Sequence, residues 1–362
     1  MSQTPFTLRF GILSTGAIAM TFCESLLKND YGPNYSVQVV AVVSRDLERG
    51  KQFGEKLKQE DGDMKVYASY DEFFSDENVD IVYVASPHYF HYEHCKMALE
   101  AKKHVLCEKA FTINAKEAKE LVELARKNNV FLMEGMWTRF FPVSRRIIQL
   151  IQEGKIGQVR NINVSLGFVG EKRNSDKNHR LYNIDLGGGA LLDCGVYCIS
   201  AISMITSSLG YKLSKVQSSM HINPETKTDD QCSGLIEFQH ENGKPIFGTF
   251  NSTFVNECTR TLEISGTDGM IVVNNSFHRP VSFSLIKSTS ETFEFSGKGV
   301  DYQEGTGFFY EIKHILEMIQ QGNIESPIMP LSETISVMEI MDEIRSVHGL
   351  IYPKELNELN QQ

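Results

Sequence analysis

The amino-acid sequence predicts an α/β protein in which an N-terminal doubly wound parallel sheet precedes an α+β domain with a large, mostly antiparallel open sheet. Between residues 8 and 133, short apolar segments alternate with segments of helical periodicity, which is typical of a parallel sheet covered by helices on both faces. Beyond residue 213 the segments are mostly strand-like and are separated by turn signals. A chain of 362 residues also exceeds what one hydrophobic core usually serves, which favours two domains.

The N-terminal domain, which we expect to span residues 1–137, consists of strands and helices in alternation. Each expected strand is a short apolar run, and each expected helix repeats apolar residues at helical spacing. In chain order the elements are a strand at 8–13, a helix at 17–29, strands at 37–43 and 80–85, a helix at 91–101, a strand at 104–107, a helix at 114–128 and a strand at 130–133. Ligands of such sheets lie beyond the carboxyl ends of the strands, so we expect the site there.

The C-terminal domain, expected at residues 138–362, begins where the pattern changes near Pro142. We expect helices at 143–152 and around Asp193 and Tyr197, strands at 159–169, 216–222, 233–238, 246–254, 260–264, 270–273 and 281–286, and two closing helices at 307–320 and 332–348. Polar and apolar residues alternate between Thr249 and Phe254, so one sheet face should be exposed or face a partner. We therefore predict a homodimer formed through the free face of the C-terminal sheet.

The turn between the first strand and the first helix resembles a dinucleotide-binding fingerprint, which has the form G-x-G-x-x-G/A. Gly16 and Ala19 occupy its second and third positions, and Ser14 replaces the first glycine. The glycines of this motif allow a tight turn and bring the pyrophosphate close to the helix N-terminus. We therefore expect five residues of this turn to contact a dinucleotide: Ser14, Thr15, Gly16, Ala17 and Ile18.

The end of the second strand favours NADP over NAD. A carboxylate at this position would hold the ribose hydroxyls of NAD, whereas an arginine suits the 2′-phosphate of NADP. The chain has Ser44 and Arg45 here, with Arg49 one helical turn later. Serine donates a hydrogen bond and arginine binds phosphate bidentately, so we expect Ser44 and Arg45 to contact NADP. The alternative is a solvated arginine at a helix start, paired with Asp46.

Two later strands of the same sheet also end in polar residues. Ser86 and Pro87 follow the strand at 80–85, and Glu108 and Lys109 follow the strand at 104–107. These four residues are expected to contact the cofactor, because the carboxyl ends of parallel strands lie at one edge of the sheet.

Three histidines, His88, His91 and His94, follow Pro87 at a spacing that superficially resembles a metal site. No carboxylate or thiol completes a ligand set with them, so a capping or cofactor-contact role is favoured over a metal. His91 is the one we expect to contact the cofactor, near the nicotinamide. We predict no metal site in this chain.

Composition excludes several classes of function. The formal net charge of −10 and pI near 5.6 argue against a nucleic-acid-binding surface, which needs a basic footprint. The longest apolar runs are too short to span a bilayer, and no signal-like segment is present, so we expect no membrane partner and a cytoplasmic location. The seven cysteines form no Cys-x-x-Cys pair, which suits reduced thiols.

A glycine-rich segment at 187–189 precedes a helix that carries Asp193 and Tyr197. These two residues are four apart and so project from one helical face. Together with Lys109 they would supply the proton chemistry that a hydride transfer needs. Each also has a structural reading: Tyr197 as a core tyrosine, Asp193 as a charge near a helix N-terminus and Lys109 as a surface lysine.

Over nearly its whole length the chain resembles the Gfo/Idh/MocA family, the glucose-fructose oxidoreductase and inositol dehydrogenase superfamily. It is most similar to the branch with the dimeric dihydrodiol dehydrogenases and NADP-dependent D-xylose 1-dehydrogenases. The matching segments are 11–16, 103–110, 131–142 and 187–197. Ala110 stands where the family usually has proline. Without the proline, the loop that holds the lysine is expected to be less rigid. Tyr197 stands where much of the wider family has histidine, which fits this branch.

The resemblance implies a role for each candidate residue. Tyr197 would be the acid/base; free tyrosine titrates near ~10, and a nearby lysine ammonium would favour the phenolate. Lys109 would bind the reacting oxygen or a cofactor ribose, and Asp193 would accept a hydrogen bond from a substrate hydroxyl. Glu108 would position the cofactor or the lysine. The further substrate contacts expected are the pocket walls Trp137 and Phe168, and Arg139.

The function expected is therefore an NADP-dependent dehydrogenase that oxidises the anomeric hydroxyl of a sugar such as D-xylose. Oxidation of trans-dihydrodiols by the same residues is the second reading, and a non-enzymatic NADP-binding regulator is the third. A pure sensor would be free to lose Lys109 and Tyr197, and the chain keeps both. The Lys-, Arg- and Asn-rich segment 171–183 is expected to be a lid or a dimer contact.

Overall fold

The computed structural model describes residues 4–57, 64–169, 177–241, 243–274, 276–287, 292–296 and 307–359. The chain forms two compact units that are not continuous in sequence. The first comprises Met1–Thr112, Lys116–Trp137 and Asp301–Thr334, and the second comprises Ile113–Ala115, Thr138–Val300 and Ile335–Gln362. A C-terminal segment thus returns to the N-terminal unit.

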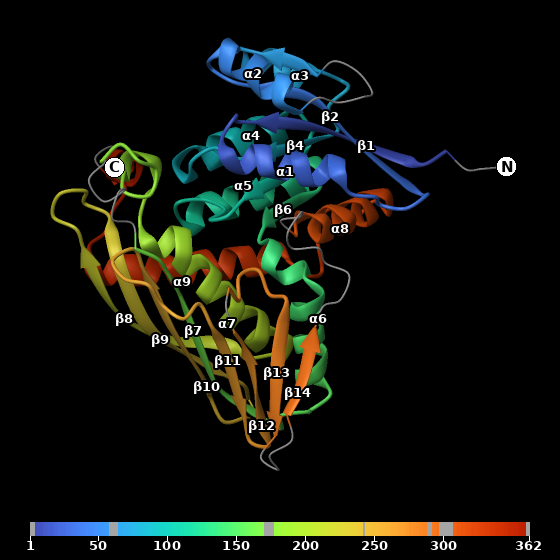
Figure 1. The fold of residues 1–362 in the computed structure, drawn as a ribbon. Helices are drawn as coiled ribbons and strands as arrows, with labels where there is room; N and C mark the ends of the chain where they lie inside the picture. Colours follow the sequence, from blue (N-terminus) through green and yellow to red (C-terminus); the bar gives the residue numbers. More distant parts are fainter. Residues whose placement is uncertain are drawn as a thin grey trace. The chain divides into compact units, whose positions relative to one another are not determined.

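A six-stranded parallel sheet organises the first unit, with strand order β3-β2-β1-β4-β5-β6 (Figure 1). The strands are β1 (Phe6–Leu13), β2 (Tyr35–Val43), β3 (Lys65–Tyr67), β4 (Ile81–Val84), β5 (His104–Glu108) and β6 (Leu132–Gly135). Every residue of β4 is buried, which explains why this strand is apolar without alternation; β6 is equally buried, and it includes Glu134. The predicted doubly wound sheet is confirmed, and the last strand begins two residues later than expected.

Helices connect these strands by crossovers. They are α1 (Ala17–Lys28), α2 (Leu47–Leu57), α3 (Tyr70–Ser75), α4 (His91–Glu100), which a 3₁₀ turn at His88–Phe90 precedes, and α5 (Ala115–Asn128), most of which belongs to this unit. Helix α8 (Phe308–Gln320) joins the same unit from far along the chain. Its Phe308 ring lies 5.4 Å from the ring of Phe22 on α1, edge to face.

An eight-stranded sheet organises the second unit, with strand order β14-β13-β12-β11-β7-β10-β9-β8. The strands are β7 (Val159–Gly167), β8 (Lys212–Ile222), β9 (Asp229–Gln239), β10 (Ile246–Thr253), β11 (Leu262–Gly266), β12 (Gly269–Val273), β13 (Ser282–Lys287) and β14 (Thr292–Ser296). Among the described strand pairs of this sheet, β7 with β10 is parallel and the others are antiparallel. The large, mostly antiparallel sheet is thereby confirmed.

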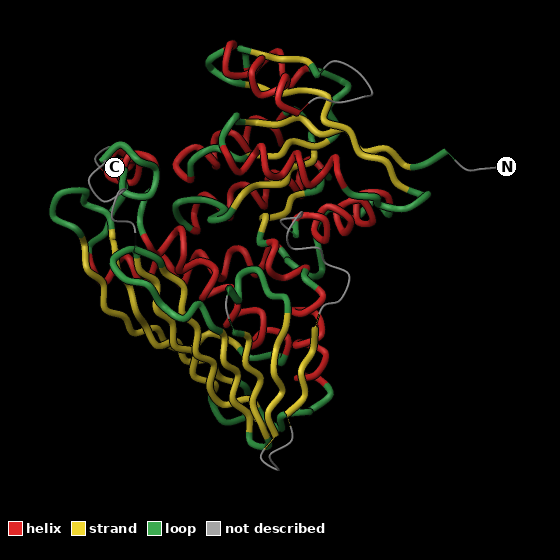
Figure 2. The backbone as a smooth tube through the Cα atoms, in the orientation of Figure 1, coloured by secondary structure: helices red, strands yellow, loops and turns green. Residues whose placement is uncertain are grey.

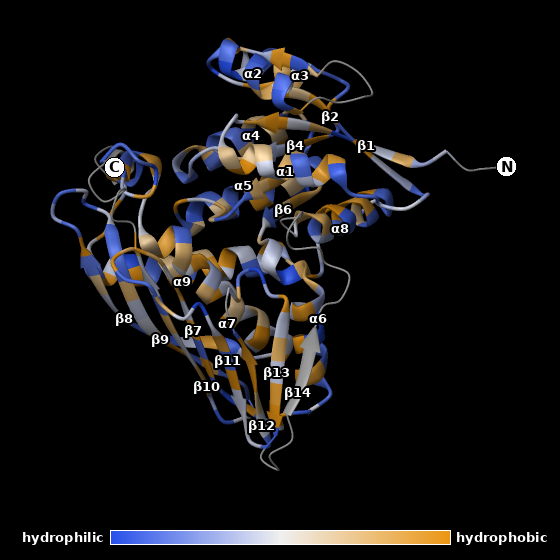
Figure 3. Cartoon of the chain, viewed as in Figure 1, coloured by the Kyte–Doolittle hydropathy of each residue, from blue (hydrophilic) through white to orange (hydrophobic). Residues whose placement is uncertain are grey.

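Helices cover one face of this sheet, as Figures 1 and 2 show. They are α6 (Pro142–Gln152), α7 (Val196–Ser208) and most of α9 (Leu331–His348). Side chains alternate between the two faces, so the strands carry both hydrophobic and hydrophilic residues along their length (Figure 3). The helix-covered face holds the core of the unit.

The segment Ile184–Ser208, which contains α7, has the length and apolar composition of a membrane span, yet 94% of its apolar window is buried inside the protein. This is the pattern of a core helix. The expectation that two helices close the chain was wrong, because a third, α10 (Pro353–Leu359), follows them. Its start signal was present in the sequence as Pro353 at the first helical position.

Candidate active site

A crevice of about 1090 Å³ lies in the first unit, at the carboxyl ends of its strands. It is lined by most of the residues expected to contact a cofactor: Ser14, Thr15, Gly16, Ala17, Ser44, Arg45, Ser86 and Pro87. The lining also includes His94, one of the three histidines discussed above, and five residues that the sequence did not single out: Met20, Gln52, Lys56, Tyr70 and Phe90. Ile18, with 40% of its surface exposed, is not part of this lining.

Backbone hydrogen bonds join the strand ends at this crevice. The N–H of Ser14 donates to the carbonyl of Val43 (3.4 Å), and the N–H of Ala85 donates to the carbonyl of Leu13 (3.1 Å). These bonds bring the residues after β1, β2 and β4 to the same edge of the sheet, as the parallel topology requires.

The start of α1 is open to an anion. Gly16 precedes the helix, and as a glycine it has no side chain to accept the first helical N–H groups. The first turn of α1 also carries no acidic residue. The backbone N–H groups and the positive end of the helix dipole therefore face the crevice, the arrangement that binds phosphate in dinucleotide sites.

Ser14 adopts a backbone conformation that glycine would take without strain. Its φ is +117°, in the region that L side chains rarely occupy. Its Oγ accepts a hydrogen bond from the N–H of Gly16 at 3.3 Å. Serine thus makes the turn that the first glycine of the fingerprint usually makes, at a cost in backbone strain.

The crevice is positively charged near the end of β2. Arg45, Arg49 and Lys56 line it against one carboxylate, Asp46. The Asp46 Oδ1 accepts a hydrogen bond from the N–H of Arg49 at 3.1 Å and so caps α2. Asp46 Oδ2 also lies 4.0 Å from Nε of Arg49. The expected alternative, an arginine at the start of the helix paired with Asp46, thus describes Arg49 rather than Arg45. Three cations at one place suit a phosphate group.

His94 and Phe90 form a wall of the crevice. Their rings stack at 5.9 Å, and His94 Nδ1 is 2.9 Å from the hydroxyl of Ser86. The guanidinium of Arg45 lies 5.8 Å from the centre of the Phe90 ring. Burial, followed by the charges on His91 and Arg45, lowers the pKa of His94 to about 4, so it is neutral at pH 7.

His91 lies behind this wall, fully buried and outside the crevice lining. Its Nδ1 is 2.9 Å from the carbonyl of Ala110, and its Nε2 is 2.7 Å from the carbonyl of Ser86. Burial lowers its pKa to about 4 in spite of both carbonyls, so the ring is neutral and donates its single N–H to one of them. The ring supports the loops after β4 and β5, including Ala110, which is itself fully buried.

Two acidic side chains of the first unit, Glu108 and Glu311, are buried and interact electrostatically. The hydroxyl of Tyr83 donates to Glu108 Oε1 at 2.5 Å, and Glu108 is 7% exposed. Glu311 on α8 is fully buried, and neither of its carboxylate oxygens has a hydrogen-bond partner among the described residues. Burial and then the charge of Glu108 raise the pKa of Glu311 well above its ordinary value. Burial therefore favours the neutral form of the Glu311 carboxyl group.

In the second unit, Asp193 and Tyr197 follow the glycine-rich segment 187–189, which we call the hinge, and they lie on two kinds of helix. Asp193 lies in a π turn, Leu191–Gly195, and Tyr197 lies in the first turn of α7. Such wider turns occur frequently at functional sites. Asp193 Oδ1 forms an ion pair with Arg180 Nη1 at 2.9 Å, and the Tyr197 ring lies 5.6 Å from that of His278. Arg180 lies within the segment 171–183 but was not singled out by itself, and no sequence pattern indicated His278.

The three further substrate contacts expected from the sequence, Trp137, Arg139 and Phe168, have different packing partners. Arg139 is 2% exposed, and its guanidinium donates to the hydroxyl and the carbonyl of Ser200 on α7, both at 3.1 Å. Phe168 packs against Phe254 with ring centres 5.2 Å apart. Trp137 belongs to the first unit, where its ring lies 4.7 Å from that of Phe308.

Part of the segment 171–183 lies outside the described residues, which resume at Lys177. Within the described chain no group of three or more His, Cys, Asp or Glu side chains could hold a metal ion. The seven cysteines are all free thiols.

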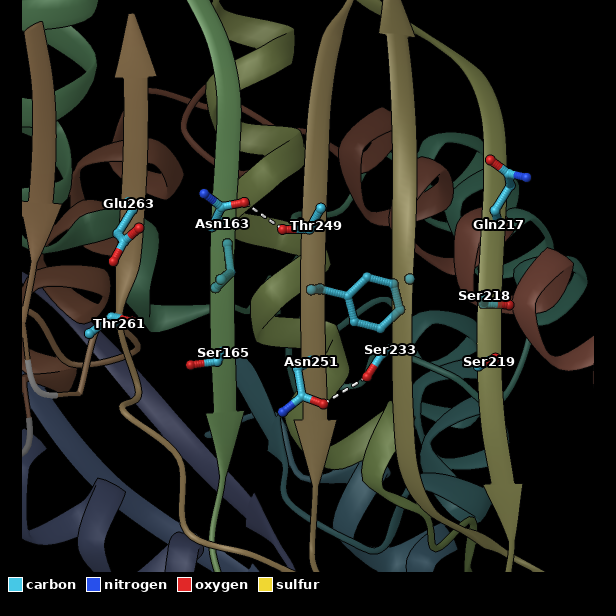
Figure 4. A pocket seen from close by; sticks show the side chains of 13 residues that line it. Asn163, Ser165, Gln217, Ser218, Ser219, Ser233, Thr249, Asn251, Thr261 and Glu263 are labelled. Carbon is cyan, nitrogen blue, oxygen red and sulfur yellow. Dashed lines mark hydrogen bonds between the residues drawn. The ribbon is translucent and has the colours of Figure 1, made fainter.

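The helix-free face of the eight-stranded sheet has a shallow hollow of about 630 Å³ (Figure 4). Polar side chains cross it in rows, with Thr249 donating to Asn163 at 2.6 Å and Ser233 donating to Asn251 at 2.7 Å. Strand register adds apolar side chains on the same face: Leu235, Phe247, Met270, Val272 and Ile286.

Two known family models match this chain. A family model described as an oxidoreductase family with an NAD-binding Rossmann fold matches residues 8–136. A second model, the GFO/IDH/MocA C-terminal domain, matches residues 144–272. Together the two matches cover the first sheet from residue 8 onward, the second sheet from β7 into β12, and the glycine-rich segment at 187–189.

Several full-length relatives are similar. A D-xylose 1-dehydrogenase (NADP(+)) from Hypocrea jecorina is 36% identical, over 98% of this chain and 95% of that protein. The trans-1,2-dihydrobenzene-1,2-diol dehydrogenase of Homo sapiens is 34% identical, over 96% of this chain and 99% of that protein.

Among solved structures, the 3-ketoreductase KijD10 from Actinomadura kijaniata, in complex with NADP and TDP-benzene, matches with a TM-score of 0.77. It is 23% identical, and the match covers 94% of this chain and 98% of that one. A levoglucosan dehydrogenase in complex with NADH and levoglucosan matches with a TM-score of 0.78 at 19% identity, over 95% of this chain and 97% of that one. At these identities the likeness establishes the fold.

The strain at Ser14 makes a testable prediction. Ser14→Gly and Ser14→Ala both lose the Oγ that accepts from the Gly16 N–H, but only glycine removes the cost of a positive φ. The free energy of unfolding of Ser14→Gly should therefore exceed that of Ser14→Ala by about 1 kcal/mol. Urea unfolding of both variants checks the pair; equal destabilisation by glycine and alanine would contradict the account.

Proposed function

This chain belongs to the Gfo/Idh/MocA family of oxidoreductases, and we propose that it is an NADP-dependent dehydrogenase that oxidises the hydroxyl of a small sugar. The D-xylose 1-dehydrogenase type fits best, because the relative of that type is 36% identical over 98% of this chain. The observation that carries the proposal is the crevice of the first unit, which combines an open helix N-terminus with a cluster of cations.

The residues of the crevice fit NADP. The start of α1 would hold the pyrophosphate, and Ser44 with Arg45 would hold the 2′-phosphate. Arg49 and Lys56 add charge of the same sign, and Asp46 is engaged as the cap of α2. The remaining proposed contacts are Ser86, Pro87, Glu108 and Lys109, with His91 supporting them from behind.

The proton chemistry is assigned to three residues. Bound NADP would supply the hydride acceptor for the carbinol carbon. Tyr197 takes the proton of the same hydroxyl, and Lys109 binds the oxygen on which charge develops, so the C–OH group becomes a carbonyl. Oxidation at an anomeric carbon gives a lactone. Asp193 accepts a hydrogen bond from a neighbouring substrate hydroxyl.

The surroundings of the second unit support these roles. Arg180 pairs with Asp193 and favours its ionised, accepting form. Arg139 holds α7 through Ser200, three residues after Tyr197, which orients the helix that carries the base. Phe168 and Trp137 are proposed walls of the substrate pocket.

Oxidation of trans-dihydrodiols is the second candidate, favoured by relatives of that activity at 33–35% identity, such as the Homo sapiens enzyme at 34%. Both candidates use the same residues and differ in the shape of the substrate. A non-enzymatic NADP-binding regulator is the third, and the retention of Lys109 and Tyr197 argues against it.

We also propose a cytoplasmic homodimer without nucleic-acid or membrane partners. Residues 1–137 would bind the cofactor, and residues 138–362 would bind substrate and form the dimer. The helix-free sheet face supports this, since it presents apolar side chains beside its rows of polar ones, and a two-fold dimer would bury this patch against its own copy.

Turnover tests the function directly. Purified protein with NADP and D-xylose should produce absorbance at the reduced-nicotinamide band, and NAD, D-glucose, myo-inositol and a trans-dihydrodiol complete the panel. Tyr197→Phe and Lys109→Met should each lower kcat by about 100- to 10,000-fold, because each removes a group that acts on the reacting oxygen. NADP binding should persist in both.

Matched controls are Tyr211→Phe and Lys127→Met, which make the same chemical changes at positions outside the proposed site. Turnover that persists in Tyr197→Phe at the wild-type rate would remove the acid/base assignment. Tight NADP binding without turnover on any substrate would favour the regulator.

Cofactor preference tests the cation cluster. Arg45→Ala should raise the Kd of NADP by about 10- to 100-fold, because a charge-assisted hydrogen bond to the 2′-phosphate is lost, and should leave the Kd of NAD nearly unchanged. Lys51→Ala on the same helix, where the lysine pairs with Glu48, is the control. A parallel loss of NAD and NADP affinity in Arg45→Ala would show that Arg45 does not read the 2′-phosphate.

The sheet face is tested by sedimentation. Wild-type protein should sediment as a dimer, and Thr249→Arg should sediment as a monomer, because an unpaired arginine would be buried at the centre of the interface. Thr7→Arg, at an exposed strand position of the first unit, should stay dimeric. A Thr249→Arg variant that remains dimeric would place the interface elsewhere.

A further inference from the structure

Asp229, the first residue of β9, is a buried carboxyl group that holds the hinge ahead of Asp193. Its Oδ2 accepts a hydrogen bond from the N–H of Leu191 at 2.7 Å. Leu191 is the first residue of the π turn, and two residues later the N–H of Asp193 donates to the carbonyl of Gly189 at 3.1 Å. The carboxyl group therefore fixes the backbone from which Asp193 projects.

The second oxygen of Asp229 is in contact with the hinge itself. Gly189 has φ of +132°, and a Cβ atom added there would lie 2.2 Å from Asp229 Oδ1. Oδ1 has no hydrogen-bond partner among the described residues. The hydroxyl of Tyr352 donates to the carbonyl of Gly188 at 3.0 Å, so the hinge is held from two directions. Only glycine satisfies both the conformation and the close approach at position 189.

The charged and titratable groups around Asp229 shift its pKa in opposite directions. They are Asp230 and Cys232 on β9, Arg345 on α9 with its partners Asp342 and Glu355, and Tyr352 ahead of α10. Burial has the largest effect and, together with Asp230, raises the pKa of Asp229 to about 7, although the Leu191 hydrogen bond and Arg345 act in the opposite direction. Asp229 thus changes charge in the neutral range.

We propose that Asp229 is a positioning residue for the reaction, whose ionised carboxylate fixes the hinge and the turn that carries Asp193, and whose protonation loosens them. A carboxylate accepts a hydrogen bond roughly twice as strongly as a neutral group, and a negative charge at the start of a helical segment is favoured by the dipole. The predicted effect on kcat rests on the proposed dehydrogenase function. The predicted titration of Asp229 is independent of that function.

Asp229→Asn tests the proposal, because asparagine keeps the shape and the acceptor but stays neutral. At about pH 8 its kcat should be about three- to tenfold below wild type. A rise of kcat around neutral pH, present in the wild type, should be absent from the variant, while the Kd of NADP is unchanged. Asp230→Asn is the matched control: it should keep this rise and move it to lower pH, because it removes a charge that raises the Asp229 pKa.

Thermal unfolding gives a readout that needs no turnover. The folded state holds the Asp229 proton more tightly than the unfolded chain, in which aspartate titrates near ~3.9. Asp229 therefore contributes stability that is present below that pH and is lost as the pH rises to about 7. The Tm of the wild type should fall more steeply over this range than the Tm of Asp229→Asn.

Two results would overturn the inference: equal pH dependence of Tm in wild type and Asp229→Asn, or an unchanged kcat profile in an active Asp229→Asn enzyme. If no substrate is turned over, the Tm comparison alone decides whether Asp229 titrates as proposed. Gly189→Ala provides a second route, since its Cβ would displace the carboxyl group. It should reproduce the kcat loss, and the double variant should lose less than the product of the two single effects.

Discussion

Hydrogen bonds between the ends of parallel strands are the constraint on which the cofactor site depends. The residues after β1, β2 and β4 have little choice of position, because Ser14 and Ala85 donate backbone bonds to Val43 and Leu13. The strained φ of Ser14 follows from this requirement: the chain must turn into α1 within a few residues of the strand end. The open helix start and the cations of α2 then face one crevice without further adjustment.

The second unit has a different constraint, which is to hold Asp193 and Tyr197 at the start of a helix that is mostly buried. Tyr197 lies in the first turn of α7, and Asp193 lies in the π turn before it. A π turn and three glycines make that possible, and buried polar groups compensate for the irregular backbone. Asp229 and Tyr352 bind the hinge, and Arg139 binds α7 one turn after Tyr197.

Hydrophobic periodicity predicted the fold class, and the resemblance of four sequence segments predicted the family; both predictions are confirmed. Residues close in sequence to a motif, such as Ser44 and Arg45, were found by position relative to a strand end. Groups that reach the site from distant segments carry no such signal. Arg180, His278, Asp229 and Glu311 are examples, because only the folded chain brings them to their partners. The buried position of His91 could not be predicted either, since the sequence does not distinguish a histidine after a strand end that faces the crevice from one that faces the core.

Transfer of deuterium from substrate to nicotinamide is the measurement that tests the central claim most directly. The protein would be incubated with NADP and D-xylose labelled with deuterium at the anomeric carbon, and the nicotinamide ring would be analysed by mass spectrometry and NMR. The account predicts that the label appears at the hydride-accepting carbon with wild-type protein and not with Tyr197→Phe. Absence of label in the cofactor, with D-xylose and with labelled D-glucose and dihydrodiol alike, would contradict a hydride-transferring enzyme of this type.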